Sequence, residues 1–98
     1  MAWSEEVKKK VWEKGTPSVD PKWKKDACGA WIYWDHFGIQ SDYGWNIDHI
    51  QPVSKEGTDD ISNLRPLHWE NNLSKANGNL VCLVSSEGSA NKKKSSGQ

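Results

Sequence analysis

The 98-residue chain fits one small domain, and its 13 basic and 13 acidic side chains give a formal net charge of zero. Only 35% of the residues are hydrophobic, and none of the apolar runs approaches the length that spans a bilayer, so composition gives no support to a role in a membrane. A domain of this size buries only about 60 to 65% of its unfolded surface. We therefore expect the seven tryptophans, each able to bury roughly 150 to 250 Å², to supply much of the core.

The charges are unevenly spread along the chain. Residues 1–25 carry seven lysines against four acidic residues, residues 26–75 carry three basic against eight acidic residues, and residues 76–98 carry three lysines against one glutamate. An acidic centre repels a phosphate backbone unless a divalent cation is bound there, whereas basic ends can hold that backbone. The alternative is a mixed, solvated surface without a nucleic-acid partner.

The two cysteines, Cys28 and Cys82, are far apart in the sequence. The N-terminal segment enters charged residues directly and does not resemble a secretory signal. We therefore expect reduced thiols in a cytoplasmic protein.

In the first half of the chain, Ser4 is the expected N-cap of a helix over residues 4–14, which Gly15 ends. Residues 16–21 then form a connector. The sequence predicts three further segments here, namely a short helical turn at 21–25, a strand at 30–34 and a hairpin loop at 36–44.

In the second half, residues 45–50 alternate between apolar and polar side chains as a strand does, and residues 64–67 can form a short strand at a sheet edge because Pro66 lacks an N–H. The remaining expectations are a helix at 69–77, a last strand at 79–84 and disorder from Ser85 onward. The domain prediction is thus one domain over residues 1–84, with its core at about 45–77, and a flexible polar and basic tail over 85–98.

The predicted helix at 69–77 has one apolar face on a helical wheel, made by Trp69, Leu73 and Ala76. Asn72 lies at the shoulder of that face, with His68 and Lys75 on the same flank. Asn71 points nearly opposite and is expected to face water. Asn72 is therefore the asparagine predicted to enter a crevice between helix and sheet.

Asp48 and His49 end the strand predicted at 45–50 and could bring a carboxylate and an imidazole to that crevice. Asp48 and Asn72 would supply oxygen ligands for a hard cation, and His49 a general base. Neighbours on a regular strand point to opposite faces, so this requires the chain to leave regular β geometry at these residues. The alternative is an ordinary strand end with a hydrogen-bonded histidine.

The combination of these residues resembles the HNH endonuclease family, and within it the HNN variant, in which asparagine replaces the last histidine. The resemblance covers about residues 12–77 and rests on "KKDACGAWI", "YGWNIDHI", Pro52-Val53-Ser54, Asp59-Asp60, Asn63-Leu64, Pro66-Leu67, and Asn72 with Lys75. It implies an α+β fold, a ββα-metal (His-Me finger) core with an N-terminal helix and an additional β-hairpin.

The resemblance also implies roles for single residues. Asp48 and Asn72 correspond to the ligands of one divalent cation, Mg²⁺ or Mn²⁺, His49 to the general base, and Asn63 to the residue that braces the loop behind the histidine. Two further residues, Lys75 and Arg65, are candidates for contacts with nucleic acid. For Lys75 the alternative is a solvated side chain, and for Arg65 it is an ion pair with Asp59 or Asp60.

Many relatives carry a zinc knuckle, whose four positions here appear as Cys28, Trp31, His68 and Asn71. Only two of these can bind metal, so a structural Zn²⁺ is not expected, and we infer that packing by Trp31 and Trp69 takes its place. The chain departs from the family in two further places: Glu56 stands where glycine is common, and Asn46 where glutamate is frequent.

The resemblance implies a metal-dependent DNA endonuclease of a phage or bacterium, located in the cytoplasm of the bacterial or infected cell. It would act on double-stranded DNA and nick one strand per encounter, and it would cut both strands only as a dimer or by repeated nicking. The expected assemblies are a homodimer or a larger phage or restriction assembly. Two alternatives are a catalytically inactive accessory protein with the same fold that binds or packages DNA, and a zinc-stapled interaction module.

Overall fold

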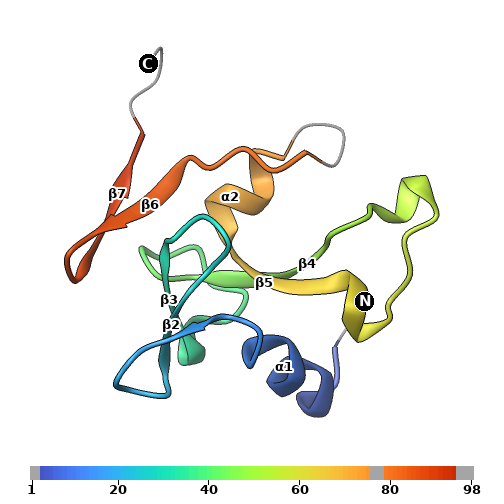
Figure 1. Cartoon of the computed structure of the whole chain (residues 1–98), viewed down its shortest axis with the longest axis horizontal. Coiled ribbons are helices and arrows are strands. Elements are labelled where there is room, and N and C mark those ends of the chain that lie inside the picture. Colours follow the sequence, from blue (N-terminus) through green and yellow to red (C-terminus); the bar gives the residue numbers. More distant parts are fainter. Residues whose placement is uncertain (1–2, 76–78, 95–98) are drawn as a thin grey trace.

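The computed structural model describes residues 3–75 and 79–94, and within them the chain is α+β, as predicted, with few helices and several antiparallel strands. The elements follow the chain from the N-terminal helix to a C-terminal hairpin (Figure 1). Their bounds are α1 (Glu5–Trp12), β1 (Thr16–Pro17), β2 (Trp23–Lys25), β3 (Trp31–Tyr33), β4 (Trp45–His49), β5 (Leu64–His68), α2 (Trp69–Leu73), β6 (Val84–Glu87) and β7 (Ala90–Lys93), with 3-10 turns at Trp34–His36, Val53–Lys55 and Ile61–Asn63.

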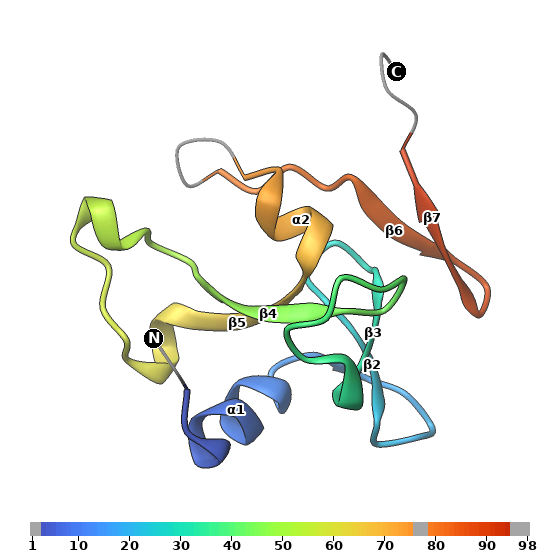
Figure 2. The same ribbon diagram turned by 180° about the vertical axis from the view of Figure 1, so that it is seen from behind.

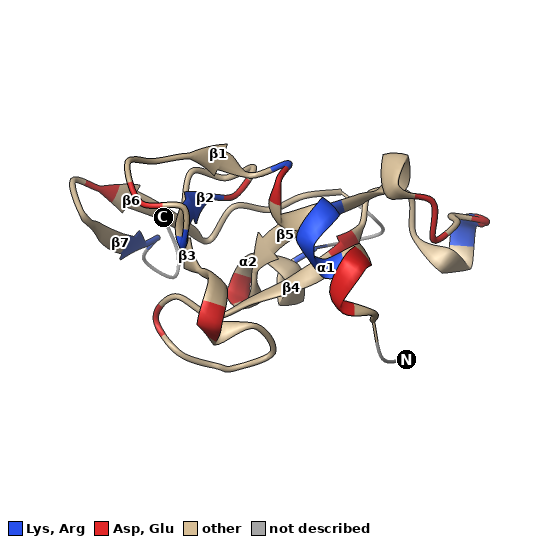
Figure 3. Cartoon of the chain, turned by 90° about the horizontal axis from the view of Figure 1, so that it is seen from below, with Lys and Arg blue, Asp and Glu red and all other residues tan. Residues whose placement is uncertain are grey.

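Helix α1 begins where the sequence predicts. The Ser4 side chain accepts a hydrogen bond from the Val7 N–H, and acidic residues in the first turn and basic residues in the last turn complement the helix dipole (Figure 3). Val11 and Trp12 at its end are buried. The cap and the charge order therefore start the helix, and these two residues anchor it to the core.

Strands β4 and β5 form the antiparallel pair at the centre of the molecule, with α1 and α2 on opposite sides in both views (Figures 1 and 2). The pair runs in register from Trp45 opposite His68 to His49 opposite Leu64. The core gathers against α1, and its buried members are Val11, Trp12, Ile32, Trp45, Ile47 and Leu64. Tryptophan is thus part of the core, as expected, and Trp3 and Trp34 pack against its edge.

The helical turn predicted at 21–25 is wrong, because Trp23–Lys25 is a strand. Strand β2 pairs with β1 on one side and with β3 on the other. The Trp23 ring lies 4.6 Å from the Tyr33 ring and 4.8 Å from the Tyr43 ring between centroids. Contacts with residues distant in sequence therefore decide the conformation of this lysine-rich segment.

The C-terminal segment also differs from the prediction. The last strand expected at 79–84 begins only at Val84, and residues 84–93, where disorder was expected from Ser85 onward, form the β6–β7 hairpin. Asn91 fastens this hairpin to the domain, because its Oδ1 accepts from the Trp31 N–H at 2.6 Å and its Nδ2 donates to the carbonyls of Trp31 and Asp42.

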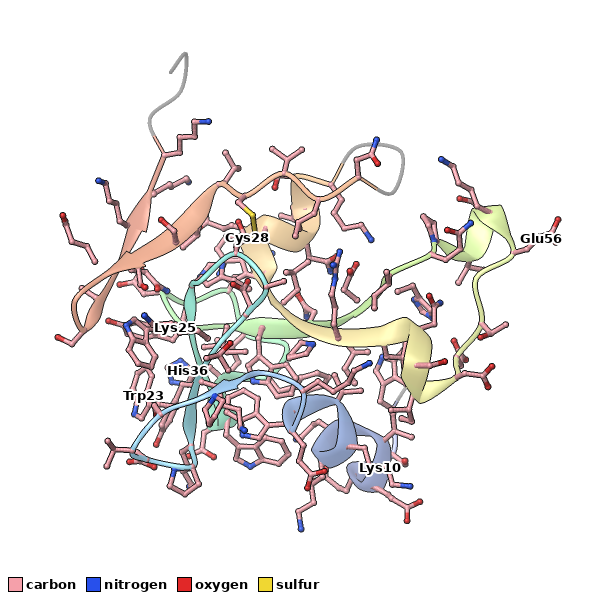
Figure 4. The ribbon with its side chains drawn as sticks, in the orientation of Figure 1. Lys10, Trp23, Lys25, Cys28, His36 and Glu56 are labelled. Atoms are coloured by element: carbon pink, nitrogen blue, oxygen red, sulfur yellow. A yellow bond between two sulfur atoms is a disulfide. The ribbon has the colours of Figure 1, made fainter. Side chains whose placement is uncertain are left out.

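Cys28 and Cys82 form a disulfide, so the expectation of reduced thiols is wrong for this structure (Figure 4). The bond joins the loop after β2 to the segment that leads into β6. The long separation in sequence concealed a close approach in space.

Among the residues that the structure describes, no helix has the length and apolar character needed to cross a membrane.

Candidate active site

The loop between β4 and β5 is organised by the side chain of Asn63. Its Oδ1 accepts from the Gln51 N–H at 2.8 Å, and its Nδ2 donates to the carbonyls of Gln51 at 3.1 Å and Thr58 at 2.8 Å. Its own carbonyl accepts from the Ile50 N–H at 2.8 Å. A single residue thus connects the start, the middle and the end of the loop, which is the arrangement that a bracing role requires.

His49 is the last residue of β4 and leads into this loop. Its side chain is 22% exposed, and its Nε2 lies 2.7 Å from the Asp59 Oδ1. A carboxylate can only accept, so Nε2 donates and the neutral ring carries its acceptor lone pair on Nδ1. The Trp3 ring packs 5.7 Å from the imidazole. The contact between Asp59 and His49 was not predicted, because its only signal in the sequence is a carboxylate within the loop that follows the histidine.

Asp48, the preceding residue, is 4% exposed and has both carboxylate oxygens in ion pairs. The Arg65 Nε lies 2.8 Å from Oδ2, and the Lys75 Nζ lies 2.7 Å from Oδ1. Arg65 is the cross-strand partner of Asp48, and Lys75 arrives from the segment after α2. Arg65 thus pairs neither with Asp59 nor with Asp60, and Lys75 is not a solvated side chain.

The expected departure from regular β geometry at Asp48 and His49 does not occur. The strand pairing continues through both residues, and the bend begins at Ile50. The two side chains therefore point to opposite faces of the strand pair and have different surroundings: Asp48 meets the two basic side chains, and His49 meets Trp3 and Asp59.

The prediction that Asn71 faces water is wrong, because Asn71 is fully buried. Its Nδ2 donates to the Asp26 Oδ2 and to the Val84 carbonyl, and its Oδ1 accepts from the Val84 N–H. Leu73, placed on the apolar face by the helical wheel, is 71% exposed. The segment entering β6 covers the far side of α2 and so buries the face that the wheel assigned to solvent. Ala76, the third residue of that face, lies outside the described residues.

Asn72 is half-buried, and its carbonyl accepts from the Lys75 N–H. The side chain of Lys75 reaches from this short segment to Asp48. The end of α2 and the end of β4 are therefore connected through Lys75, although Asp48 and Asn72 are separated by 24 positions in the sequence.

Three of the four zinc-knuckle positions, Cys28, His68 and Asn71, are linked through Asp26. Asp26 accepts hydrogen bonds from the N–H groups of Cys28 and Ala30 through Oδ1, and from the His68 N–H and Asn71 Nδ2 through Oδ2. These bonds join the segment at Cys28 to the start of α2, and the disulfide joins Cys28 to Cys82, in the segment that leads into β6. Trp31 and Trp69, which we inferred to pack in place of a structural zinc, have separate partners. Trp31 contacts Trp23 and Lys25, and Trp69 stacks on His68.

Both ring nitrogens of His68 are in use, since Nδ1 accepts from the Glu70 N–H and Nε2 donates to the Asp42 carbonyl. His36, the third histidine, pairs through Nδ1 with the Ser41 hydroxyl. Within residues 3–75 and 79–94, no cluster of three or more His, Cys, Asp or Glu side chains could hold a metal ion. A cation held by Asp48 and Asn72 would have only two protein ligands, which is the sparse ligation that Mg²⁺ accepts because it keeps its waters.

One comparison with known proteins, that with family models, matches this region. The model of the HNH endonuclease family matches residues 34–83, a stretch that contains β4, the Asn63 loop, β5 and α2. Searches among curated proteins and among solved structures found no match. Because the matched stretch makes up half of the sequence and includes the motif residues, the chain belongs to the HNH endonuclease family.

Proposed function

We propose that the protein is a metal-dependent DNA endonuclease that hydrolyses a phosphodiester bond at a single active site. Membership of the HNH family supports a nuclease, and nucleases of this family act on DNA. The observation that carries the proposal is His49: a partly exposed imidazole at the end of β4, held by Asp59 and followed by a loop that Asn63 closes.

In this proposal His49 acts as the general base. With Nε2 donating to Asp59, its Nδ1 accepts a proton from the attacking water. Asp59 fixes the ring orientation, and Asn63 fixes the backbone at Gln51, two residues after His49. A positioned general base contributes about 10²- to 10⁴-fold to such a reaction, so the loss of His49 should be measured easily.

Asp48 and Asn72 are the residues that would hold one divalent cation, Mg²⁺ or Mn²⁺, since both offer hard oxygen donors and family members usually use a divalent metal. When bound, the cation supplies positive charge to the phosphate and the leaving oxygen. The buried Asp48 carboxylate is already paired with two cationic side chains, so a divalent cation at this position would have to replace one of them. His49 and Asp48 face different sides of the strand pair, so the scissile phosphate would have to lie at the end of β4 to be reached by both.

The proposed substrate is double-stranded DNA, bound weakly and in a salt-sensitive way because the chain has zero net charge. One active site cuts one strand per encounter, so cleavage of both strands would require a homodimer or repeated nicking. Lys75 and Arg65 remain proposed phosphate contacts: Lys75 would first have to leave Asp48, whereas Arg65 contacts Asp48 through Nε and keeps its other N–H donors for phosphate.

A second candidate is an inactive accessory protein with the same fold that binds DNA. The ion pairs of Asp48 favour it, since a carboxylate held by Arg65 and Lys75 can serve structure alone.

Nicking of supercoiled plasmid separates the two candidates. We expect nicking with Mg²⁺ or Mn²⁺, none with EDTA, and a loss of at least about 100-fold in His49→Ala, the size of effect expected for a general base. His36→Ala is the matched control, because His36 lies away from the loop that contains Glu56 (Figure 4) and should keep activity. Equal nicking by wild type and His49→Ala, or none by wild type with either metal, would reject the nuclease and leave the accessory protein.

A further inference from the structure

The ammonium group of Lys75 contacts Asp48, the proposed cation ligand, and the backbone of the next residue in β4. Its ammonium lies 2.7 Å from the Asp48 Oδ1 and also donates to the His49 carbonyl at 2.8 Å. The Lys75 side chain is 11% exposed and that of Asp48 4% exposed. This is a largely desolvated contact and not a surface ion pair, so removing either partner without a replacement would leave the other charge buried and unpaired.

The charges around Asp48 leave no place for an additional cation. Arg65 and Lys75 bring two positive charges to one carboxylate. A divalent ion that binds Oδ1 while both remain would be repelled at short range in a poorly solvated site. One of the two basic side chains must therefore move away when the ion binds.

Lys75 is the one that can move. Arg65 lies directly opposite Asp48 in the register of β4 and β5, so its backbone is fixed by the strand pair. Lys75 lies beyond the last residue of α2, and its flexible four-carbon stem can turn without moving either strand. It is also three residues from Asn72, the second proposed ligand, and its N–H donates to the Asn72 carbonyl.

We infer that Lys75 is a built-in counter-cation of Asp48 that a divalent cation displaces, and that the released ammonium then becomes available to the phosphate of the substrate. This inference rests on the proposed function in one respect, that Asp48 is a cation ligand. It predicts that cation affinity is limited by competition with Lys75, and that loading of the cation and exposure of Lys75 occur together.

Direct binding of Mn²⁺, followed by electron paramagnetic resonance of the free ion, tests the competition without any measurement of cleavage. Lys75→Met keeps the length of the side chain and removes its charge, and we expect it to bind Mn²⁺ at least about tenfold more tightly than wild type. Lys75→Arg keeps the charge and should bind no more tightly than wild type. Lys93→Met, which removes a charge that pairs with Glu70, is the matched control for net charge and should leave affinity unchanged.

An affinity of Lys75→Met equal to or below that of wild type would overturn the inference, provided that circular dichroism shows the variant folded. If Lys75→Met does not fold, the reactivity of Lys75 in the wild-type protein provides the test instead. Amine acetylation followed by mass spectrometry should find Lys75 protected without Mg²⁺ and several-fold more reactive with saturating Mg²⁺. Lys14, which donates to the backbone carbonyls of Ile61 and Leu64, should show no such change. Unchanged reactivity of Lys75 would overturn the inference.

The outcomes also distinguish this inference from the proposed function. Tighter Mn²⁺ binding by Lys75→Met in a protein that never nicks DNA would reject the nuclease and keep the displacement of Lys75. Nicking by wild type together with unchanged Mn²⁺ affinity in Lys75→Met would keep the nuclease and reject the displacement.

Discussion

Asn63 shows how one amide can hold a whole loop. Its Nδ2 donates to the carbonyls of Gln51 and Thr58, while its Oδ1 accepts from the Gln51 N–H. Asn63→Asp keeps the acceptor but turns the donor into a second acceptor that faces two carbonyl oxygens. We expect the free energy of unfolding to fall by about 1 to 2 kcal/mol. Nicking should fall by more than about tenfold, because the loop positions His49. Urea unfolding and the plasmid assay measure the two effects.

The control for this prediction is Thr58→Val. It removes a hydroxyl that donates to Asp60 but leaves the Thr58 carbonyl that Asn63 uses. We expect near wild-type stability and activity in this variant. If Asn63→Asp behaves like Thr58→Val, the side chain of Asn63 does not hold the loop.

Single residues of the site differ in how far the sequence could predict them. The bracing contacts of Asn63 follow from a local motif, and the structure provides them within one loop. The surroundings of Asn71 could not be predicted, because a helical wheel assumes one buried face, and the chain after α2 returns through Val84 to create a second. The ion pairs of Asp48 depend likewise on the tertiary position of Lys75.

The turn in the loop between β4 and β5 carries Glu56 in a conformation that glycine favours. Its φ is 68° and its ψ 22°, in the left-handed region, and its side chain is exposed at the end of the loop (Figure 4). A side chain there costs roughly 1 to 2 kcal/mol, and glycine loses about 0.4 to 1 kcal/mol more than other residues in chain entropy on folding. Glu56→Gly should therefore raise the free energy of unfolding by about 0.5 to 1 kcal/mol, measured by thermal or urea unfolding.

Glu56→Ala tests whether the backbone is the cause. It removes the carboxylate but keeps the Cβ, so we expect no gain in stability. Equal stabilisation by alanine and glycine would assign the effect to the charge of Glu56. The neighbouring Gly57 is not replaceable, because a Cβ there would lie 1.7 Å from the Gln51 carbonyl oxygen.

The elements that the sequence predicts well are those with local signals. Helix α1 has a serine cap and an ordered charge pattern, and β4 alternates apolar and polar residues from Trp45 to Asp48. Strand β2 and the β6–β7 hairpin are too polar for such signals: they are fixed by Tyr33 and Tyr43 against Trp23, and by Trp31 and Asp42 against Asn91. Partners distant in sequence thus decide the segments that local reasoning assigned to a helical turn and a disordered tail.

At the scale of the whole molecule, two layers of contact hold a small domain together. Tryptophan, leucine and isoleucine form the core between α1 and the β4–β5 pair. On the other side of that pair, Asp26 and Asn71 bind α2 to the loop after β2 and to β6 by buried hydrogen bonds. Since buried polar groups are costly when unpaired, this second layer fixes the position of α2, and with it the positions of Asn72 and Lys75.

The Cys28–Cys82 disulfide closes this second layer over a sequence separation of 54 residues. Loop-closure entropy for a separation of this size corresponds to about 4 kcal/mol of stabilisation, a large share of the roughly 5 to 15 kcal/mol of a typical domain. Reduction by dithiothreitol should therefore lower the urea midpoint markedly. The Cys28→Ser/Cys82→Ser variant should match the reduced protein and show no further response to dithiothreitol. The same urea midpoint for oxidised and reduced protein would contradict the prediction. In a reducing compartment the protein would therefore have only the lower stability of its reduced form.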